Sequence, residues 1–215
     1  MHYTSVLFDL DGTLLDTLGD LTAAMNRTLT RHGLPERTRQ QMRAALGNGA
    51  RRLMELSVPA GTDGALFETL LAEYNADYAA HCRIETAPYP GIDALLRQLH
   101  AQGRKLAIVS NKPDEAVRAL RAEFFADTVP IAVGEKQGIR RKPAPDTLLT
   151  AMAQLGAERE STVYVGDSEV DIATARAAGL PCISVLWGFR DRDVLEQAGA
   201  QQFAADADEL ARLLD

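Results

Sequence analysis

The chain has 215 residues and a net charge of −7, so it is long enough for one core domain with a small insertion. No block of Lys and Arg is long enough to follow a nucleic-acid backbone, and no apolar run approaches the ~20 residues that cross a membrane. The N-terminus lacks the pattern of a signal peptide. We therefore expect a cytoplasmic protein that binds neither nucleic acid nor membranes.

The first predicted element is a buried strand over residues 6–8, and it leads into two carboxylates. Asp9 and Asp11 are spaced i, i+2, so they leave the strand on the same side. Gly12 permits a sharp turn, and Thr13 offers a hydroxyl beside it. Two carboxylates this close need a cation or a shared proton, and oxygen ligands favour Mg²⁺. For an isolated D-x-D-G, a helix-capping Asp followed by a turn is the simpler interpretation.

A helical region follows without any strand signal. Apolar residues recur at helical spacing, and glycines and prolines separate the segments. Its size suits a small helical bundle inserted into the core. We expect an inserted helical domain at residues 16–83 and a core domain at 1–15 and 84–215. The predicted helices lie at about 18–29, 38–46, 50–56 and 66–78.

From residue 88 onward, predicted strands and helices alternate. This order predicts an α/β fold with a parallel sheet covered on both faces, and ligands in such sheets bind beyond the carboxyl ends of the strands. The predicted strands are 105–109, 129–133, 162–165 and 181–185. The predicted helices are 90–99, 113–120, 145–155, 169–178, 191–198 and 207–214.

Polar signatures end two of these strands, and a further one lies in a loop. Ser110 precedes a helix, where its hydroxyl and nearby N–H groups could hold phosphate oxygens, although a simple helix cap is the alternative. Lys142 lies in a proline-stiffened loop and could neutralise Asp9 and a phosphate, unless it is a solvated loop lysine. Asp167 could be a third Mg²⁺ carboxylate, with Asp171 supporting it from behind; acids enriched at a helix N-terminus are the alternative.

Together these groups could carry out phosphoryl transfer. Asp9 is placed to be a nucleophile that forms an aspartyl-phosphate. Asp11 could protonate the leaving oxygen and later deprotonate the attacking water, which is typically worth about 10²–10⁴ in rate.

The order of the signatures resembles the haloacid dehalogenase superfamily of phosphatases. The sequence Asp9-Leu10-Asp11-Gly12-Thr13 looks like its first motif, Ser110-Asn111 its second, Lys142-Pro143 its third, and Gly166-Asp167 with Asp171 its fourth. The resemblance implies a Rossmann-like core, an aspartyl-phosphate intermediate, and Mg²⁺ held by Asp9, the Asp11 backbone carbonyl and Asp167. The helical insertion resembles the C1-type cap of the family. The presence of Asp11 argues against the dehalogenases, which lack this acid/base.

Within the superfamily, further details resemble the phosphoglycolate phosphatases, notably Gly47-Asn48-Gly49 and Trp187-Gly188-Phe189. Asn48 and Arg51 could reach the substrate from the helical domain, and Arg51 would suit a carboxylate unless it is a surface arginine. The expected partner is a small phosphorylated metabolite, and the expected state is a monomer or homodimer. The open alternatives are a phosphosugar mutase, a pyrophosphatase and a phospho-switch of the receiver type. The expected substrate-binding residues are Gly12, Thr13, Asn48, Arg51, Ser110, Asn111 and Lys142.

Overall fold

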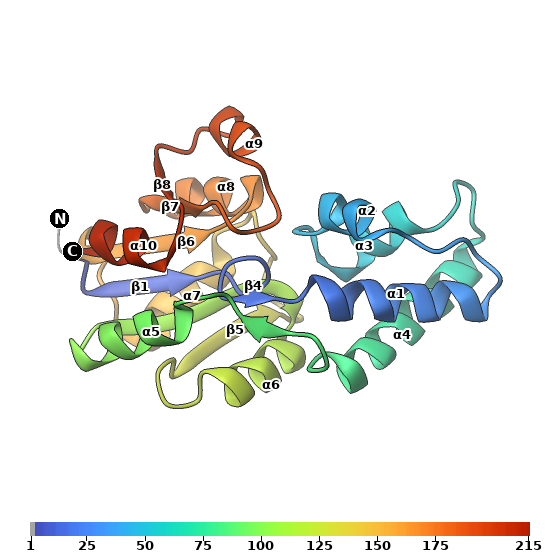
Figure 1. Ribbon diagram of the computed structural model, residues 1–215, viewed down its shortest axis with the longest axis horizontal. Coiled ribbons are helices and arrows are strands. Elements are labelled where there is room, and N and C mark those ends of the chain that lie inside the picture. Colours follow the sequence, from blue (N-terminus) through green and yellow to red (C-terminus); the bar gives the residue numbers. More distant parts are fainter. Residues whose placement is uncertain (1–2) are drawn as a thin grey trace. The chain divides into compact units, whose positions relative to one another are not determined.

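The computed structural model describes residues 3–215, which form two compact units (Figure 1). One unit contains the chain up to Leu15 together with Pro88–Asp215, and the other is Asp16–Ala87. The second boundary therefore falls four residues later than the sequence predicts. Residues 84–86 belong to the helical unit because their backbone N–H groups donate hydrogen bonds to the carboxylate of Asp20.

A parallel sheet of six strands forms the core of the first unit. The strand order is β5-β4-β1-β6-β7-β8, and every neighbouring pair is parallel. The chain moves from β1 to one edge and then returns to build the other edge, so the centre of the sheet is its topological switch point. The strands are β1 (Ser5–Phe8), β4 (Lys105–Pro113), β5 (Ile131–Glu135), β6 (Thr162–Gly166), β7 (Cys182–Val185) and β8 (Gln202–Ala204).

The strands differ from the sequence prediction in four places. The strand predicted at 129–133 is shifted by two residues, since β5 covers Ile131–Glu135. The predicted end of the second core strand at Val109 was wrong, because β4 continues to Pro113 with a register shift between these two residues. Strand β8 was not predicted, since its three residues are too few to show alternation. Two-residue strands β2 (Leu15–Asp16) and β3 (Ala87–Pro88) pair where the chain passes between the units, so the inserted region does begin and end in strand.

Helices cover both faces of the sheet (Figure 1). Helices α7 and α8 contact each other, and their apolar side chains pack on Leu7, Val109 and Tyr164 of the sheet. Helices α5 and α10 contact each other on the other face, and α6 packs on β4 and β5. The helices are α5 (Ile92–Ala101), α6 (Asp114–Phe124), α7 (Asp146–Leu155), α8 (Glu169–Ala178), α9 (Arg192–Gln197) and α10 (Ala207–Leu214), with a 3₁₀ turn at Arg159–Ser161.

The second unit is a bundle of four helices, in which α1 packs on α2 and α4, and α3 packs on α2 and α4. Apolar residues at helical spacing on α1 and α4 are buried between them. A capping box between Thr38 and Gln41 begins α2, and the side chain of Asp63 caps α4. The helices are α1 (Leu18–Arg31), α2 (Arg39–Ala45), α3 (Gly49–Ser57) and α4 (Gly64–His81).

The ion pairs of buried Asp77 should contribute more to stability than the exposed ion pair of Glu68. Asp77 on α4 is buried and accepts hydrogen bonds from Arg27 and Arg31 of α1 at 2.6–2.9 Å. Burial acts to raise the pKa of Asp77, but the two arginines outweigh it and hold this pKa below its ordinary value. Asp77→Asn should therefore lower the free energy of unfolding by about 1–2 kcal/mol at pH 7.

The pKa of Asp77 is lower in the folded than in the unfolded protein. The difference in free energy of unfolding between the unmodified protein and Asp77→Asn should therefore be largest above the pKa of the unfolded protein, and it should vanish as the pH falls through the pKa of the folded protein. Denaturant titrations of both proteins at several pH values measure it. Glu68→Gln is the matched control, since Glu68 pairs with Arg51 in an exposed position, where such pairs contribute about 0–1 kcal/mol. An equal effect of both substitutions would contradict the prediction.

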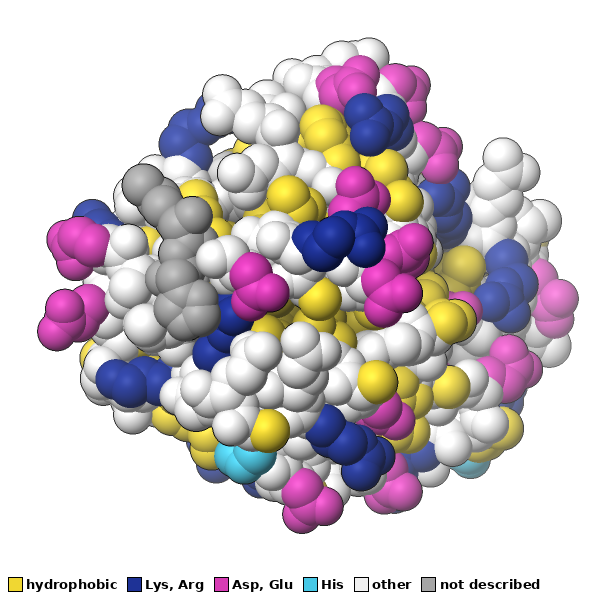
Figure 2. Space-filling view, turned by 60° about the vertical axis from the view of Figure 1, so that its left-hand side comes forward, with side chains coloured by type: hydrophobic (Ala, Val, Ile, Leu, Met, Phe, Trp, Pro, Cys, Tyr) yellow, Lys and Arg dark blue, Asp and Glu magenta, His cyan; other side chains and the backbone are white. Residues whose placement is uncertain are grey.

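On the face drawn in Figure 2, acidic and basic side chains are interspersed, with small apolar areas between them. None of the helices in residues 3–215 combines the length and the apolar character that crossing a bilayer demands.

Candidate active site

A tight turn at the carboxyl end of β1 positions the first two carboxylates. The backbone N–H groups of Leu14 and Leu15 both donate to the carbonyl of Leu10, and Gly12 adopts a φ of +83°. A side chain at Gly12 would come within 2.4 Å of Asp167 Oδ2, so glycine is needed for both conformation and space. Asp9 is buried, and its Oδ1 accepts a hydrogen bond from the N–H of Leu10 at 2.7 Å.

Lys142 is buried at the centre of the site. Its Nζ lies 2.9 Å from Asp9 Oδ1, 2.7 Å from Asp171 Oδ1 and 3.0 Å from the Tyr164 hydroxyl, which uses the three donors of an ammonium group. The side chain of Asn111 accepts from the N–H of Lys142 and donates to its carbonyl, at 2.8 and 3.0 Å. Asn111, an expected substrate ligand, thus holds the backbone of Lys142.

Two further acids come from the junction of β6 and α8. The Oδ2 atom of Asp167 accepts the N–H of Phe189 at 2.7 Å, and its Oδ1 lies 3.4 Å from the Thr13 hydroxyl. Asp171 forms a capping box with Ser168 through Oδ2, while its Oδ1 contacts Lys142 and Tyr164. Both oxygens of Asp171 are therefore engaged by protein groups, which fits a supporting place behind Asp9 and Asp167.

Burial and mutual charge shift the pKa values of Asp9, Asp167 and Lys142. Burial raises the pKa of Asp9 well above its ordinary value; the charge of Asp171 adds to this, and Lys142 opposes it. Burial and then Asp171 raise the pKa of Asp167 to about 7. For Lys142, burial acts to lower the pKa, but Asp171 and Asp9 outweigh it and raise this pKa above its ordinary value. The site thus holds three buried carboxyl groups, those of Asp9, Asp167 and Asp171, around the single ammonium of Lys142.

This excess of carboxyl groups over ammonium groups fits a hard divalent cation. Asp9, Asp167 and Asp171 each offer a carboxylate oxygen, and these oxygens lie within 4.8 Å of one another in a buried position. An all-oxygen donor set of this kind suits Mg²⁺. Oδ2 of Asp9 and Oδ1 of Asp167 are the better candidates. The latter has only a long contact of 3.4 Å with the Thr13 hydroxyl, whereas both oxygens of Asp171 accept hydrogen bonds of 3.1 Å or less.

Lys112 of β4 contacts both Asp11, which follows β1, and Ser110, which lies in β4. Asp11 Oδ1 is 2.9 Å from Nζ of Lys112, and the Ser110 hydroxyl accepts the N–H of Lys112 at 3.2 Å. The structure thus brings Asp9, Asp11, Ser110, Asn111 and Lys142 together with Asp167 and Asp171 at the carboxyl ends of β4, β1 and β6.

The two expected ligands in the helical unit have other neighbours there. Arg51 makes a two-pronged ion pair with Glu68 on α4, with distances of 2.8 and 2.9 Å, and its guanidinium lies 5.4 Å from the centre of the Phe67 ring. Asn48 precedes α3 in the N-cap position, where its side chain makes no capping hydrogen bond. Their role toward a substrate stays a prediction.

Sequence reasoning missed three site groups: the Tyr164 hydroxyl, the Lys112 ammonium and the backbone N–H of Phe189. Tyr164 reads as one more apolar position in a buried strand, and Lys112 falls beyond the predicted end of its strand. The Phe189 N–H is a backbone group and leaves no signal. The preceding Gly188 is a signal in the sequence, because a larger residue does not fit there: a Cβ would lie 2.5 Å from Asp167 Oδ2.

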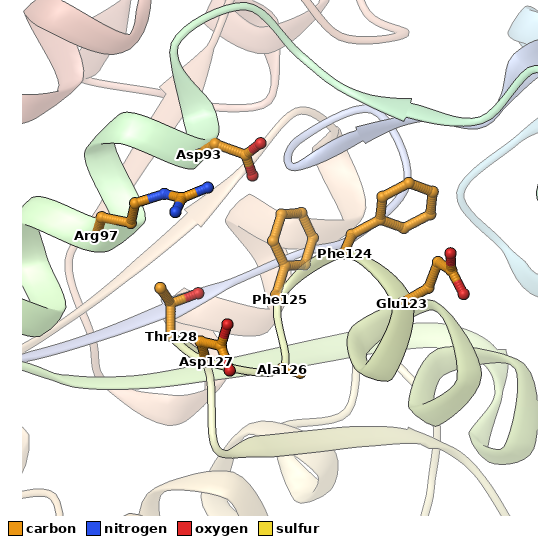
Figure 3. A pocket seen from close by; sticks show the side chains of 8 residues that line it. All are labelled: Asp93, Arg97, Glu123, Phe124, Phe125, Ala126, Asp127 and Thr128. Atoms are coloured by element: carbon orange, nitrogen blue, oxygen red, sulfur yellow. The ribbon is translucent and has the colours of Figure 1, made fainter.

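A separate pocket of about 120 Å³ lies in the core unit between α5 and the end of α6 (Figure 3). It contains none of the predicted site residues, and its walls combine both signs of charge with two aromatic rings. The lining residues are Asp93, Arg97, Glu123, Phe124, Phe125, Ala126, Asp127 and Thr128.

The fold and the buried acidic cluster define an α/β enzyme with its site at the carboxyl edge of the sheet. The family model described as haloacid dehalogenase-like hydrolase matches residues 6–185, and the chain belongs to this family. It is 36% identical over 187 residues to a phosphoglycolate phosphatase of Xanthomonas campestris pv. campestris (86% of this chain, 84% of the relative). It is 33% identical over 190 residues to the N-acetylmuramic acid 6-phosphate phosphatase of Pseudomonas aeruginosa (88% and 84%).

A solved structure of a presumed phosphoglycolate phosphatase from Lactobacillus delbrueckii subsp. bulgaricus is also similar. Its TM-score is 0.94 at 37% identity, covering 100% of this chain and 99% of that one. With these relatives the chain groups among the phosphatases of its family. The sequence prediction of the superfamily and of its fold is thereby confirmed.

Proposed function

We propose that this protein is a Mg²⁺-dependent phosphomonoester hydrolase of the cytoplasm, acting on a small phosphorylated metabolite through an aspartyl-phosphate. The observation that supports it most is the contact of buried Lys142 with both Asp9 and Asp171, beside Asp167. A carboxylate nucleophile needs positive charge beside it and beside the phosphate it attacks. The leading substrate is 2-phosphoglycolate, by likeness to the relatives.

In the first step, an oxygen of Asp9 attacks phosphorus and the ester P–O bond breaks. Oδ1 of Asp9 contacts both the N–H of Leu10 and Nζ of Lys142, which leaves Oδ2 of Asp9 as the attacking oxygen. The leaving alkoxide takes a proton from Asp11. Asp9, the Asp11 carbonyl and Asp167 would hold Mg²⁺, which when bound supplies charge neutralisation for the phosphoryl oxygens.

In the second step, water attacks the phosphorus of the aspartyl-phosphate, and Asp11 takes the proton of that water. The P–O bond to Asp9 then breaks, which releases phosphate and restores the carboxylate. Lys142 stays beside the carboxylate throughout and disperses the charge that returns to it. The Ser110 hydroxyl and neighbouring N–H groups would hold phosphoryl oxygens.

A phosphate-release assay with and without Mg²⁺ tests the proposal. The panel contains 2-phosphoglycolate, N-acetylmuramic acid 6-phosphate, pyrophosphate and β-glucose 1-phosphate. Preferred release of phosphate from 2-phosphoglycolate supports the leading substrate. Preferred release from N-acetylmuramic acid 6-phosphate supports that compound as the substrate instead, and it is the compound for which the Pseudomonas relative is named. Isomerised sugar phosphate would instead indicate a mutase, and a stable phosphoprotein without release a phospho-switch.

Gly188→Ala should raise the Mg²⁺ concentration needed for half-maximal activity about tenfold or more. Its Cβ would lie 2.3 Å from Asp167 Cβ and 2.5 Å from the Gly12 carbonyl oxygen, so Asp167 must move. Shifts of groups that orient metal ligands typically cost about 10–100-fold in affinity. Mg²⁺ titrations of activity measure the change.

The matched control is Gly64→Ala, because a Cβ at Gly64 would meet nothing within 4 Å. It should leave the Mg²⁺ titration unchanged. An unchanged titration in Gly188→Ala would count against Asp167 as a ligand.

A further inference from the structure

A second lysine lies in the site, and it contacts a different carboxylate from Lys142. Nζ of Lys112 is 2.9 Å from Asp11 Oδ1, and the side chains are 5% and 19% exposed. The backbone of Lys112 is fixed as well, because its N–H donates to the Ser110 hydroxyl within β4. Lys112 is therefore held at both ends.

The two lysines contact different acids of the site. Lys142 contacts Asp9 and Asp171, and Lys112 contacts Asp11. A lysine is almost never buried this deeply without a partner, since removing an ammonium from water is costly. The ion pair accounts for the burial of Lys112 and also holds Oδ1 of Asp11 beside Nζ of Lys112.

We propose that Lys112 is the positioning residue for Asp11. This inference rests on the proposed function. Lys112 holds the Asp11 carboxylate where a leaving oxygen, and later a water molecule, exchanges a proton with that carboxylate. A misplacement of about 1 Å in a catalytic group can cost about 100-fold in rate. Loss of Lys112 should therefore impair the steps that need proton transfer and spare a step that does not.

The test compares hydrolysis of p-nitrophenyl phosphate and of 2-phosphoglycolate by Lys112→Met. The p-nitrophenolate leaving group departs without a proton, whereas the alkoxide that leaves from 2-phosphoglycolate needs one. Under single-turnover conditions with enzyme in excess and Mg²⁺ present, release of p-nitrophenol should stay within about twofold of the unmodified enzyme, and release of glycolate should fall about 10–100-fold.

Two controls accompany this comparison. Lys136→Met removes an ammonium that is only loosely paired, 4.0 Å from Asp114, and should change neither rate. Lys112→Arg retains the positive charge and should recover part of the glycolate rate. If Lys112→Met does not fold, Lys112→Gln is measured in the same way with the same expectation.

The outcomes separate this inference from the proposed function. Equal losses with both leaving groups would assign Lys112 a general structural role and overturn the inference, as would no loss with either. An unmodified enzyme that releases neither product would overturn the proposed function itself. A loss confined to 2-phosphoglycolate supports both.

Discussion

Replacing Asp9 with Asn should abolish turnover and leave the fold at least as stable as before. An amide cannot form the acyl-phosphate, so activity on the preferred substrate should fall by about a thousandfold or more. Phosphate release measures the loss, and trapping of labelled phosphate on the protein should disappear with it. Asp193→Asn, on an exposed position of α9, is the matched control and should retain full activity.

The expected stability follows from the charge around Asp9. Burial, with Asp171 adding to it, raises the pKa of Asp9. A carboxyl whose pKa is higher in the folded than in the unfolded protein lowers the free energy of unfolding. This loss grows as the pH rises from the pKa of the unfolded protein toward that of the folded protein. Asn removes this penalty. In EDTA, the variant should therefore match the unmodified protein near pH 4 and equal or exceed it at pH 8.

Two outcomes would contradict this prediction. Substantial hydrolysis by Asp9→Asn would exclude Asp9 as the nucleophile. A marked drop in the free energy of unfolding at pH 8 would show that the pairing of Asp9 with Lys142 outweighs its burial and its repulsion by Asp171.

The grouping of the site residues could be predicted because it depends on topology more than on side-chain detail. Carboxyl ends of parallel strands meet at one edge, so Asp9 and Asp167 were expected at the same edge, and the pairing of β1 with β6 brings them close. Lys142 lies in a loop, and only its prolines and its place in the motif order indicated it. The structure places its Nζ 2.9 Å from Asp9.

What could not be predicted depends on directions that a sequence pattern does not contain. The continuous apolar run of β6 predicts that Tyr164 is buried, but not that its hydroxyl reaches Lys142 and Asp171. Lys112 belongs to the site only because β4 continues past Val109 with a register shift. Arg51 carries the charge expected of a carboxylate ligand, and its pairing with Glu68 has no sequence signal because 17 residues separate them.

Replacing Lys142 with Met should remove activity and destabilise the protein, in contrast to Asp9→Asn. Lys142 is 2% exposed, and its loss leaves Asp9 and Asp171 as buried carboxylates without their cation. Breaking a buried pair in this way typically costs about 3–5 kcal/mol. Activity should fall about a thousandfold or more, since the charge beside the nucleophile is lost.

The pH dependence and a second substitution make this prediction specific. Without Lys142 the carboxylates can relieve their repulsion by binding protons, so the loss of stability in EDTA should be smaller at pH 5 than at pH 8. Lys142→Met combined with Asp171→Asn removes one of the unpaired charges and should recover part of the stability but none of the activity. Denaturant unfolding and phosphate release measure the two effects separately. A single variant as stable as the unmodified protein, or a double variant less stable than the single one, would show that these charges do not interact as the distances imply.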